Sequence, residues 1–216
     1  AGEIIFIFNS FSFDGMNITS PFKTEIIPYL SVLDEVASAT GSVNTITRWR
    51  DGVKGFNTDP AGVVMALERR NIQLAGKKCV VMGAGGAGAS AAFSLIQRGA
   101  EVTIVNRTAE KARKLAASLG CQAAEPEFLA NIIKGAQIVI SAITSGEGFI
   151  NKNWLKRDQV VLEANYKQPV ILPLAASAGC QAISGEEWLF HQAVEAREIF
   201  FSQQKGGKVG PGTFRS

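Results

Sequence analysis

The chain has 216 residues, 46% hydrophobic and 19% charged, and its net charge of +3 includes no basic block, which argues against a nucleic-acid partner. A single histidine and three scattered cysteines exclude a histidine-rich metal site, so we expect no metal ion, and they fit a reducing, cytoplasmic compartment. No apolar run is as long as the roughly 18 residues of a membrane-spanning helix, so we expect no membrane partner.

The chain opens on the apolar run 3–8, which lacks the basic flank and the small-residue cleavage site of a signal peptide. Its start at Ala1 fits a processed form or a piece of a longer polypeptide. Four elements are then expected: a strand over 16–19, a helix over 22–30, and strands over 43–46 and 53–57. Asp51-Gly52 is a hairpin signal, and Pro60 suits the first turn of a helix that runs to about residue 70.

From residue 78 onward, short apolar runs alternate with helical patterns. We expect strands over 78–82, 102–105, 137–141 and 159–163, and helices over 86–98, 108–119 and 126–134. Continuous apolar strands separated by helices are typical of a parallel sheet that is covered on both faces. The sequence therefore predicts an α/β fold, in which a Rossmann-type parallel-sheet domain over 59–185 follows a small α/β domain over 1–58.

The end of the chain holds one more helical pattern, over 186–203. We expect this helix to pack back on the small domain over 1–58. The glycine-rich segment 204–216 that follows is typical of a mobile tail.

The run Gly83-Ala84-Gly85-Gly86-Ala87-Gly88 matches the dinucleotide-binding pattern G-x-G-x-x-G. It directly follows an apolar strand and opens a helix rich in small residues, which is the context that the pattern requires. Gly83 permits a tight turn, Gly85 lets the backbone approach a pyrophosphate, and Gly88 allows close packing of helix and strand. The amide groups at the start of that helix would hold the phosphates, which indicates a dinucleotide site.

The end of the next strand selects the cofactor. Enzymes that bind NAD usually place Asp or Glu there, on the ribose 2′-hydroxyl. Here the strand ends in Asn106-Arg107-Thr108, which holds no carboxylate to repel a 2′-phosphate. Arg107 can pair with that phosphate through charge-assisted hydrogen bonds, and Thr108 also suits the N-cap of the following helix. We therefore predict NADP as the cofactor.

Three polar residues outside the predicted Rossmann strands are candidates for the chemistry. Taken singly, each has an ordinary explanation: Lys23 as a surface lysine, Asn44 as a strand-edge residue and Asp59 as a helix N-cap. The segments that carry them decide between these explanations and a functional role.

Together these segments resemble the shikimate dehydrogenase family from about residue 15 to residue 201. The matching motifs are Asn17-Ile18-Thr19-Ser20-Pro21-Phe22-Lys23, Gly41-Ser42-Val43-Asn44-Thr45, Asn57-Thr58-Asp59-Pro60-Ala61-Gly62, the glycine run, and Asn106-Arg107-Thr108. Five motifs in the right order are far more specific than any one of them.

The resemblance implies a reversible reduction of 3-dehydroshikimate, a small-molecule substrate, to shikimate with NADPH. Lys23 and Asp59 match the catalytic pair of the family. This match is chemically consistent, because an ammonium group stabilises the negative charge that builds on the ketone oxygen and supplies a proton. The aspartate would orient the lysine and accept a hydrogen bond from a substrate hydroxyl.

The resemblance also implies a set of substrate and cofactor contacts. Thr19, Asn44 and Gln192 match positions that hydrogen-bond the substrate hydroxyls. Tyr166 matches a family tyrosine of the substrate site, and Ile143 lies in the loop on the nicotinamide side.

Three features depart from the family pattern. The family has an upstream strand with a Ser-x-Ser motif that binds the substrate carboxylate, and Ser10 and Ser12 lie too close to Asn17 to replace it. The resemblance makes residues 1–58 the substrate domain, which therefore looks truncated. The sequence of the loop at 141–146 matches the usual Asn-Ala-Thr/Ser pattern of the family only loosely. The Asn-Pro dipeptide that usually follows the family tyrosine is absent after Tyr166.

These departures leave alternatives open. The chain could act on quinate or another hydroxy acid. It could instead be a non-catalytic NADP-binding module, or a fragment of a longer protein in which the dehydrogenase is fused to dehydroquinate dehydratase. Both a homodimer and a monomer are compatible with the sequence.

Overall fold

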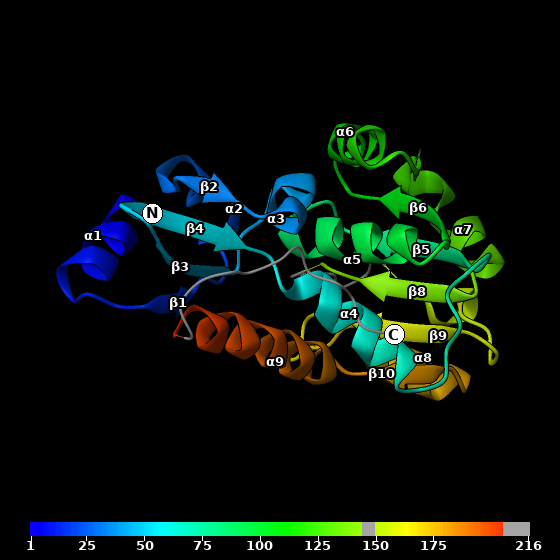
Figure 1. Cartoon of the computed structure of the whole chain (residues 1–216). Helices are drawn as coiled ribbons and strands as arrows, with labels where there is room; N and C mark the ends of the chain where they lie inside the picture. The colour runs from blue at the N-terminus through cyan, green and yellow to red at the C-terminus, as the bar shows by residue number, and fades with distance from the viewer. Residues whose placement is uncertain (144–149, 205–216) are drawn as a thin grey trace.

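The computed structural model describes residues 1–143 and 150–204, and it contains two sheets that are joined by helices (Figure 1). The first part of the chain forms a four-stranded sheet and the rest forms a six-stranded sheet. Residue 204 still belongs to the last helix, whereas the rest of the expected tail, 205–216, and most of the loop beyond Ile143 lie outside the described residues.

The four-stranded sheet has the order β1-β3-β4-β2. Its strands are β1 (Gly15–Asn17), β2 (Val32–Leu33), β3 (Thr45–Trp49) and β4 (Gly52–Phe56). As expected, β3 and β4 form an antiparallel hairpin, which pairs Thr45 with Phe56 and Trp49 with Gly52. β1 pairs antiparallel with β3, while β2 runs parallel to β4.

Short helices cover this sheet: α1 (Gly2–Ser10), α2 (Phe22–Glu25), the 3-10 turn η1 (Ile27–Tyr29) and α3 (Glu35–Thr40). The ends of α3 follow from its sequence, because the Asp34 carboxylate accepts a hydrogen bond from the Ala37 amide at 2.7 Å, and Gly41 ends the helix in the left-handed conformation. Phe8 and Ile26 are fully buried in the small core beneath these helices.

The six-stranded sheet is parallel throughout and has the order β10-β9-β8-β5-β6-β7. Its strands are β5 (Lys78–Met82), β6 (Glu101–Val105), β7 (Gln122–Ala124), β8 (Ile138–Ser141), β9 (Val160–Glu163) and β10 (Gln181–Ile183). This is the doubly wound Rossmann order, in which the order of the strands reverses between β5 and β8. Ligands of such sheets bind at the carboxyl ends of the strands at that switch point, and the glycine run follows β5 there.

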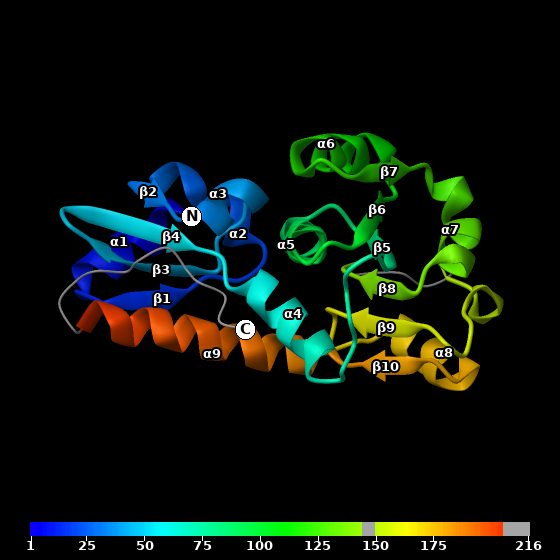
Figure 2. The same cartoon turned by 45° about the vertical axis from the view of Figure 1, so that its right-hand side comes forward.

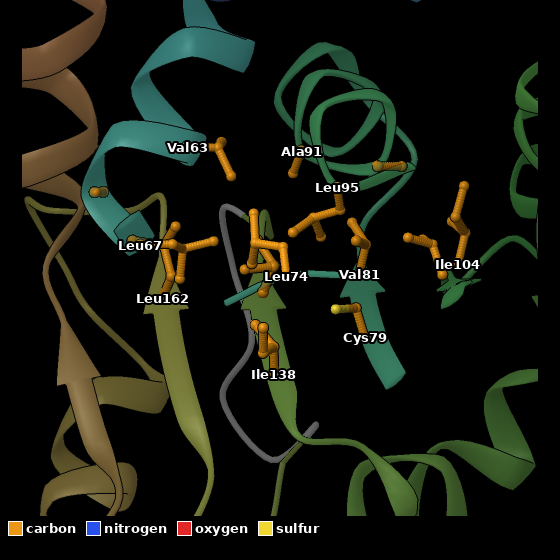
Figure 3. Packing of buried hydrophobic residues seen from close by; sticks show 14 of the residues in the cluster. Val63, Leu67, Leu74, Cys79, Val81, Ala91, Leu95, Ile104, Ile138 and Leu162 are labelled. Carbon is orange, nitrogen blue, oxygen red and sulfur yellow. The ribbon is translucent and has the colours of Figure 1, made fainter. Parts of the chain in front are cut away.

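Helices cover both faces of the six-stranded sheet: α4 (Asp59–Glu68), α5 (Gly86–Gln97), α6 (Ala109–Leu119), η2 (Pro126–Phe128), α7 (Leu129–Gly135), η3 (Lys152–Trp154), α8 (Ile171–Ala178) and α9 (Gly185–Gln204). On one face, Val63, Leu67 and Leu95 from α4 and α5 pack on the sheet residues Val81 and Ile138 (Figure 3). On the other face, buried residues of α7 and α8 pack on Met82 and Val139. The expected coverage of both faces, and with it the α/β Rossmann-type fold, is confirmed.

Two helices connect the sheets. α9 runs alongside α4 and reaches the first sheet at β3, as both views show (Figures 1 and 2). Their close approach needs Gly62 of α4, because a Cβ atom there would lie 2.7 Å from the carbonyl oxygen of Trp188. The position of α9 relative to the first sheet is therefore set largely by its packing against α4.

The structure corrects several expected elements. The helix expected over 22–30 is broken, since α2 ends at Glu25 and η1 follows; Pro28 lacks the amide that a continuous helix would need. The apolar run 3–8 lies in α1, which buries Phe8 but leaves Phe6 71% exposed. Among the described residues, no helix has the length and apolarity to span a membrane.

Candidate active site

Lys23 and Asp59 form an ion pair between the two parts of the fold. The Lys23 Nζ lies 2.5 Å from the Asp59 Oδ2, and their side chains are 21% and 7% exposed. Lys23 comes from α2, and its carbonyl accepts a hydrogen bond from the Val43 amide at 2.8 Å, which fixes the α2 backbone beside β3. Asp59 is the first residue of α4 and is not its N-cap. The N-cap explanation of Asp59 is therefore wrong, and its carboxylate is available to orient an ammonium group.

Asn44 connects this pair to the last helix. Its buried Nδ2 lies 3.2 Å from the Asp59 Oδ1, 2.9 Å from the Thr58 Oγ1 and 3.1 Å from the Gln192 Oε1. Its Oδ1 accepts a hydrogen bond from the Thr58 amide at 2.9 Å. Thr58 also donates to Gln192 at 3.1 Å. The Asp59 carboxylate thus lies at the centre of a hydrogen-bonded cluster that also contains the side chains of Lys23, Asn44, Thr58 and Gln192.

The other two residues expected to bind substrate lie outside this hydrogen-bonded cluster. Thr19 follows β1 and is exposed, and its hydroxyl has no hydrogen-bond partner among the described residues. Tyr166 follows β9 and is 39% exposed, and the Lys167 ammonium lies 5.9 Å from its ring centroid. The loop that carries Tyr166 nevertheless begins at the carboxyl edge of the parallel sheet, where ligands of this fold bind.

The glycine run forms a tight turn that only glycine permits at its two ends. Gly83 has a φ of +112°, and a Cβ atom on Gly88 would lie 2.0 Å from the Gly83 carbonyl oxygen. At Gly85, by contrast, no atom would lie within 4 Å of an added Cβ, so the space above it is open. No side chain caps the start of α5. The amide groups of its first turn therefore face a cradle that fits the phosphates of a dinucleotide.

The segment after β6 lies next to this turn. The Asn106 Oδ1 accepts a hydrogen bond from the Ala84 amide at 3.2 Å, and its Nδ2 donates to the Thr108 carbonyl at 3.0 Å. Arg107 and Thr108 are exposed, and neither side chain has a hydrogen-bond or ion-pair partner within the described part of the chain. Thr108 is the N-cap residue of α6, as expected, although its side chain makes no capping hydrogen bond. An anionic group such as a 2′-phosphate could bind both side chains without displacing an existing contact.

The glycine turn and the Lys23–Asp59 pair are neighbours. A Cβ atom on Gly86 would lie 2.6 Å from the Ser42 Oγ and 3.9 Å from the Lys23 Cβ. A Cβ atom on Gly83 would lie 2.7 Å from the Ala142 carbonyl oxygen. The next residue, the half-buried Ile143, therefore lies beside the turn. The Lys23–Asp59 pair and the glycine turn thus share one region of the molecule.

Glu163 is a buried carboxylate that sequence reasoning missed. It is 0% exposed, and its oxygens accept hydrogen bonds from the amides of Val170, Ile171 and Leu172 at 2.8, 3.0 and 3.1 Å. It therefore caps α8 and closes the loop that carries Tyr166. Its position at the carboxyl end of a strand was a usable signal, because buried carboxylates need donors.

Two family models match the chain, one described as "Shikimate / quinate 5-dehydrogenase" over residues 65–175 and one as "Shikimate dehydrogenase substrate binding domain" over residues 2–46. A shikimate dehydrogenase (NADP(+)) of Aquifex aeolicus is 32% identical over 199 residues, which cover 89% of this chain and 73% of the relative. This chain belongs to the shikimate dehydrogenase family. A second member of the family, from Halobacterium salinarum, is 38% identical over 192 residues, which cover 85% of this chain and 71% of the relative.

A solved structure of the shikimate dehydrogenase family gives the same result. The crystal structure of shikimate dehydrogenase from Aquifex aeolicus superposes with a TM-score of 0.86 at 31% identity and covers 93% of this chain and 77% of that chain. The family resemblance expected from the five motifs is therefore confirmed, and so is the Rossmann-type fold class.

Proposed function

We propose that the chain catalyses the reversible reduction of 3-dehydroshikimate to shikimate with NADPH. Relatives that are 32% and 38% identical are named NADP(+)-dependent shikimate dehydrogenases. The observation that carries the proposal is the Lys23–Asp59 ion pair, which lies beside the glycine turn and is bonded through Asn44 to Gln192.

The cofactor cradle suits NADPH. The backbone of Gly83-Ala84-Gly85-Gly86-Ala87-Gly88 would hold the pyrophosphate at the start of α5. Arg107 and Thr108, with Asn106 holding their segment against the turn, would hold the 2′-phosphate. Ile143 would contact the nicotinamide side. NADPH, when bound, supplies the hydride that reduces the ketone carbon.

The Lys23 ammonium is the acid of the reaction in the direction of reduction. Its Nζ would donate a proton to the carbonyl oxygen as negative charge builds there, and in the reverse direction the neutral amine would accept that proton. The Asp59 carboxylate keeps the Nζ in place at 2.5 Å. One carboxylate oxygen contacts the lysine, while the other lies 3.2 Å from the Asn44 Nδ2 and could accept a hydrogen bond from a substrate hydroxyl.

The substrate hydroxyls would bind to neutral polar side chains. Asn44 and Gln192 now bond to each other at 3.1 Å, and a substrate hydroxyl could replace that contact. Thr19 and Tyr166 are exposed and could add hydroxyl groups at the rim. A polyhydroxylated acid needs several such groups. A ligand that lacks one of the hydroxyls leaves a polar group of the site unpaired, and this cost discriminates against that ligand.

We propose that this chemistry divides between two domains. Residues 1–58, with helix 186–203 packed on them, would bind the substrate, and residues 59–185 would bind NADP. The three cysteines are free thiols, which fits a reducing compartment such as the cytoplasm. The enzyme would work there as a monomer or a homodimer.

The proposal is tested by following nicotinamide absorbance with shikimate and NADP, then with NAD, and then with quinate in place of shikimate. We expect reduction of NADP by shikimate to have the highest kcat/KM. A higher kcat/KM with quinate would assign the alternative substrate, which the description of the matching family model also names. A rise in melting temperature with NADPH but no turnover would support the non-catalytic NADP-binding module.

A further inference from the structure

Asn57, which lies between β4 and α4, makes hydrogen bonds in three directions. Its Nδ2 donates to the Thr40 Oγ1 at 2.8 Å and to the Ser90 Oγ at 2.9 Å. Its Oδ1 accepts a hydrogen bond from the Asp59 amide at 3.2 Å. The residue is 5% exposed, so water does not compete for these bonds. One buried amide group therefore joins α3, α4 and α5.

Ser90 continues this connection toward the cofactor cradle. Its hydroxyl is fully buried and donates to the Gly86 carbonyl at 2.8 Å, in the first turn of α5. The chain of contacts thus runs from the Asp59 backbone through Asn57 and Ser90 to Gly86. A buried polar network of this kind is costly to break, because each group that loses its partner stays desolvated.

The packing around the network leaves little room for the two sides to shift. α3 packs against α5, and the Ser42 Oγ would lie 2.6 Å from a Cβ atom on Gly86. Gly86 thus has Ser42 on one side and the Ser90 hydroxyl on the other. Ser42 belongs to residues 1–58, which we call the substrate segment. Asp59 and the glycine turn are consequently held at a fixed separation by side chains that do not themselves reach the reacting atoms.

We propose that Asn57 is a positioning residue, which through Ser90 fixes the start of α4, with Asp59, against the first turn of α5, with the glycine turn. This inference rests on the proposed function, because it assigns the alignment of substrate and nicotinamide to this bond. Transfer between two bound reactants depends steeply on their alignment, and a misplacement of about 1 Å can cost about a hundredfold in rate.

Ser90→Ala carries the test, with Ser94→Ala as its matched control. Ser94 lies one turn further along α5, is also buried, and donates to the Ala91 carbonyl at 2.9 Å, but it bonds to no residue of the substrate segment. We expect Ser90→Ala to lower kcat about tenfold, with the KM values for shikimate and NADP within about twofold of the parent values. Ser94→Ala should leave kcat unchanged.

A double-mutant cycle tests whether Asn57 and Ser90 act through the same connection. Asn57→Ala should lower kcat more than Ser90→Ala, by up to about a hundredfold. The combined variant should be no slower than Asn57→Ala alone, because both changes break the same connection. The inference would be overturned if the two single effects on kcat multiplied in the combined variant. It would also be overturned if Ser90→Ala and Ser94→Ala of an active parent had equal kcat values. Both outcomes would leave the proposed function intact.

A second readout does not depend on turnover. Hydrogen exchange of the backbone amides is followed in a peptide over residues 57–62, with and without NADPH. NADPH should slow this exchange in the parent chain and in Ser94→Ala, and the effect should be lost in Ser90→Ala. If the parent does not oxidise shikimate, the proposed function fails, and this exchange experiment still decides whether Asn57 connects the two sides. Equal slowing in Ser90→Ala would reject the connection.

Discussion

The two sides of the site are built in different ways. On the side that we propose to bind the substrate (the substrate side), side-chain hydrogen bonds join Lys23, Asp59, Asn44 and Gln192, and the central carboxylate is 7% exposed. On the cofactor side, the shape comes from the backbone of the glycine turn. Arg107, the side chain proposed to bind there, is exposed and has no partner among the described residues.

This difference indicates which property each side controls. A preassembled cluster of charged and amide groups acts on the transition state, because its dipoles need not reorganise during the reaction. An exposed arginine that binds an anion acts mainly on affinity and on the choice between cofactors. Substitution of the ion-paired lysine should therefore change kcat, and substitutions on the cofactor side should change the ratio of specificity constants.

The largest expected effect is that of Lys23→Met. Loss of the proton donor should lower kcat by about 10²–10⁴-fold, the range of general acid catalysis. The dissociation constant of NADPH, measured by fluorescence titration, should stay within about twofold, since Lys23 lies on the substrate side. Lys134→Met is the control, because Lys134 is an exposed lysine at the end of α7. A Lys23→Met enzyme with normal kcat would remove this residue from the mechanism.

Arg107→Ala should have the next largest effect, on the choice of cofactor. Charge-assisted hydrogen bonds contribute about 1.5–3 kcal/mol, so the preference for NADPH over NADH should fall by about 10- to 100-fold. The ratio of kcat/KM values for the two cofactors measures this, and kcat with saturating NADPH should change little. Arg113→Ala is the control, because this arginine is exposed on α6 but is paired with Glu110 and Glu125. An unchanged ratio would refute the assignment of the 2′-phosphate to Arg107.

The parts of the molecule that sequence predicted well are those with local signals. The four central strands were expected within one residue at each end, because each is a continuous apolar run between helical patterns. The three-residue strands β7 and β10 were missed, since Gln122–Ala124 and Gln181–Ile183 carry no distinct apolar pattern. The glycine turn was predicted from its spacing and its context.

Contacts between distant residues were harder to predict. The family resemblance placed Asn44 and Gln192 in one substrate site, but their direct hydrogen bond spans 148 positions and depends on how α9 packs on α4. Nothing local marks Ser90 as a partner of Asn57, because a serine in a small-residue helix is typical of close packing. The roles of these side chains remain predictions, whereas their placement follows from the tertiary fold.

The smallest expected effect, that of Gly62→Ala, tests whether the substrate side depends on the approach of α4 to α9. A Cβ atom at Gly62 would lie 2.7 Å from the Trp188 Cδ1 and 3.0 Å from the Gln192 Cβ, so α9 must move outward. Overpacking of this kind costs about 1–3 kcal/mol, and the KM for shikimate should rise by up to about tenfold while NADPH binding is kept. Gly135→Ala is the control, because no atom lies within 4 Å of that added Cβ.

A second variant shows whether Gly62 acts through Gln192. Gln192→Ala alone should raise the KM for shikimate, because it removes the amide that bonds to Asn44 and Thr58. In that background, Gly62→Ala should add little to KM, since the amide group that it would move out of place is already absent. A rise in KM as large as in the parent background would mean that the helix pair shapes the site through other contacts. The hydrogen-bonded cluster would then depend less on α9 than its geometry indicates.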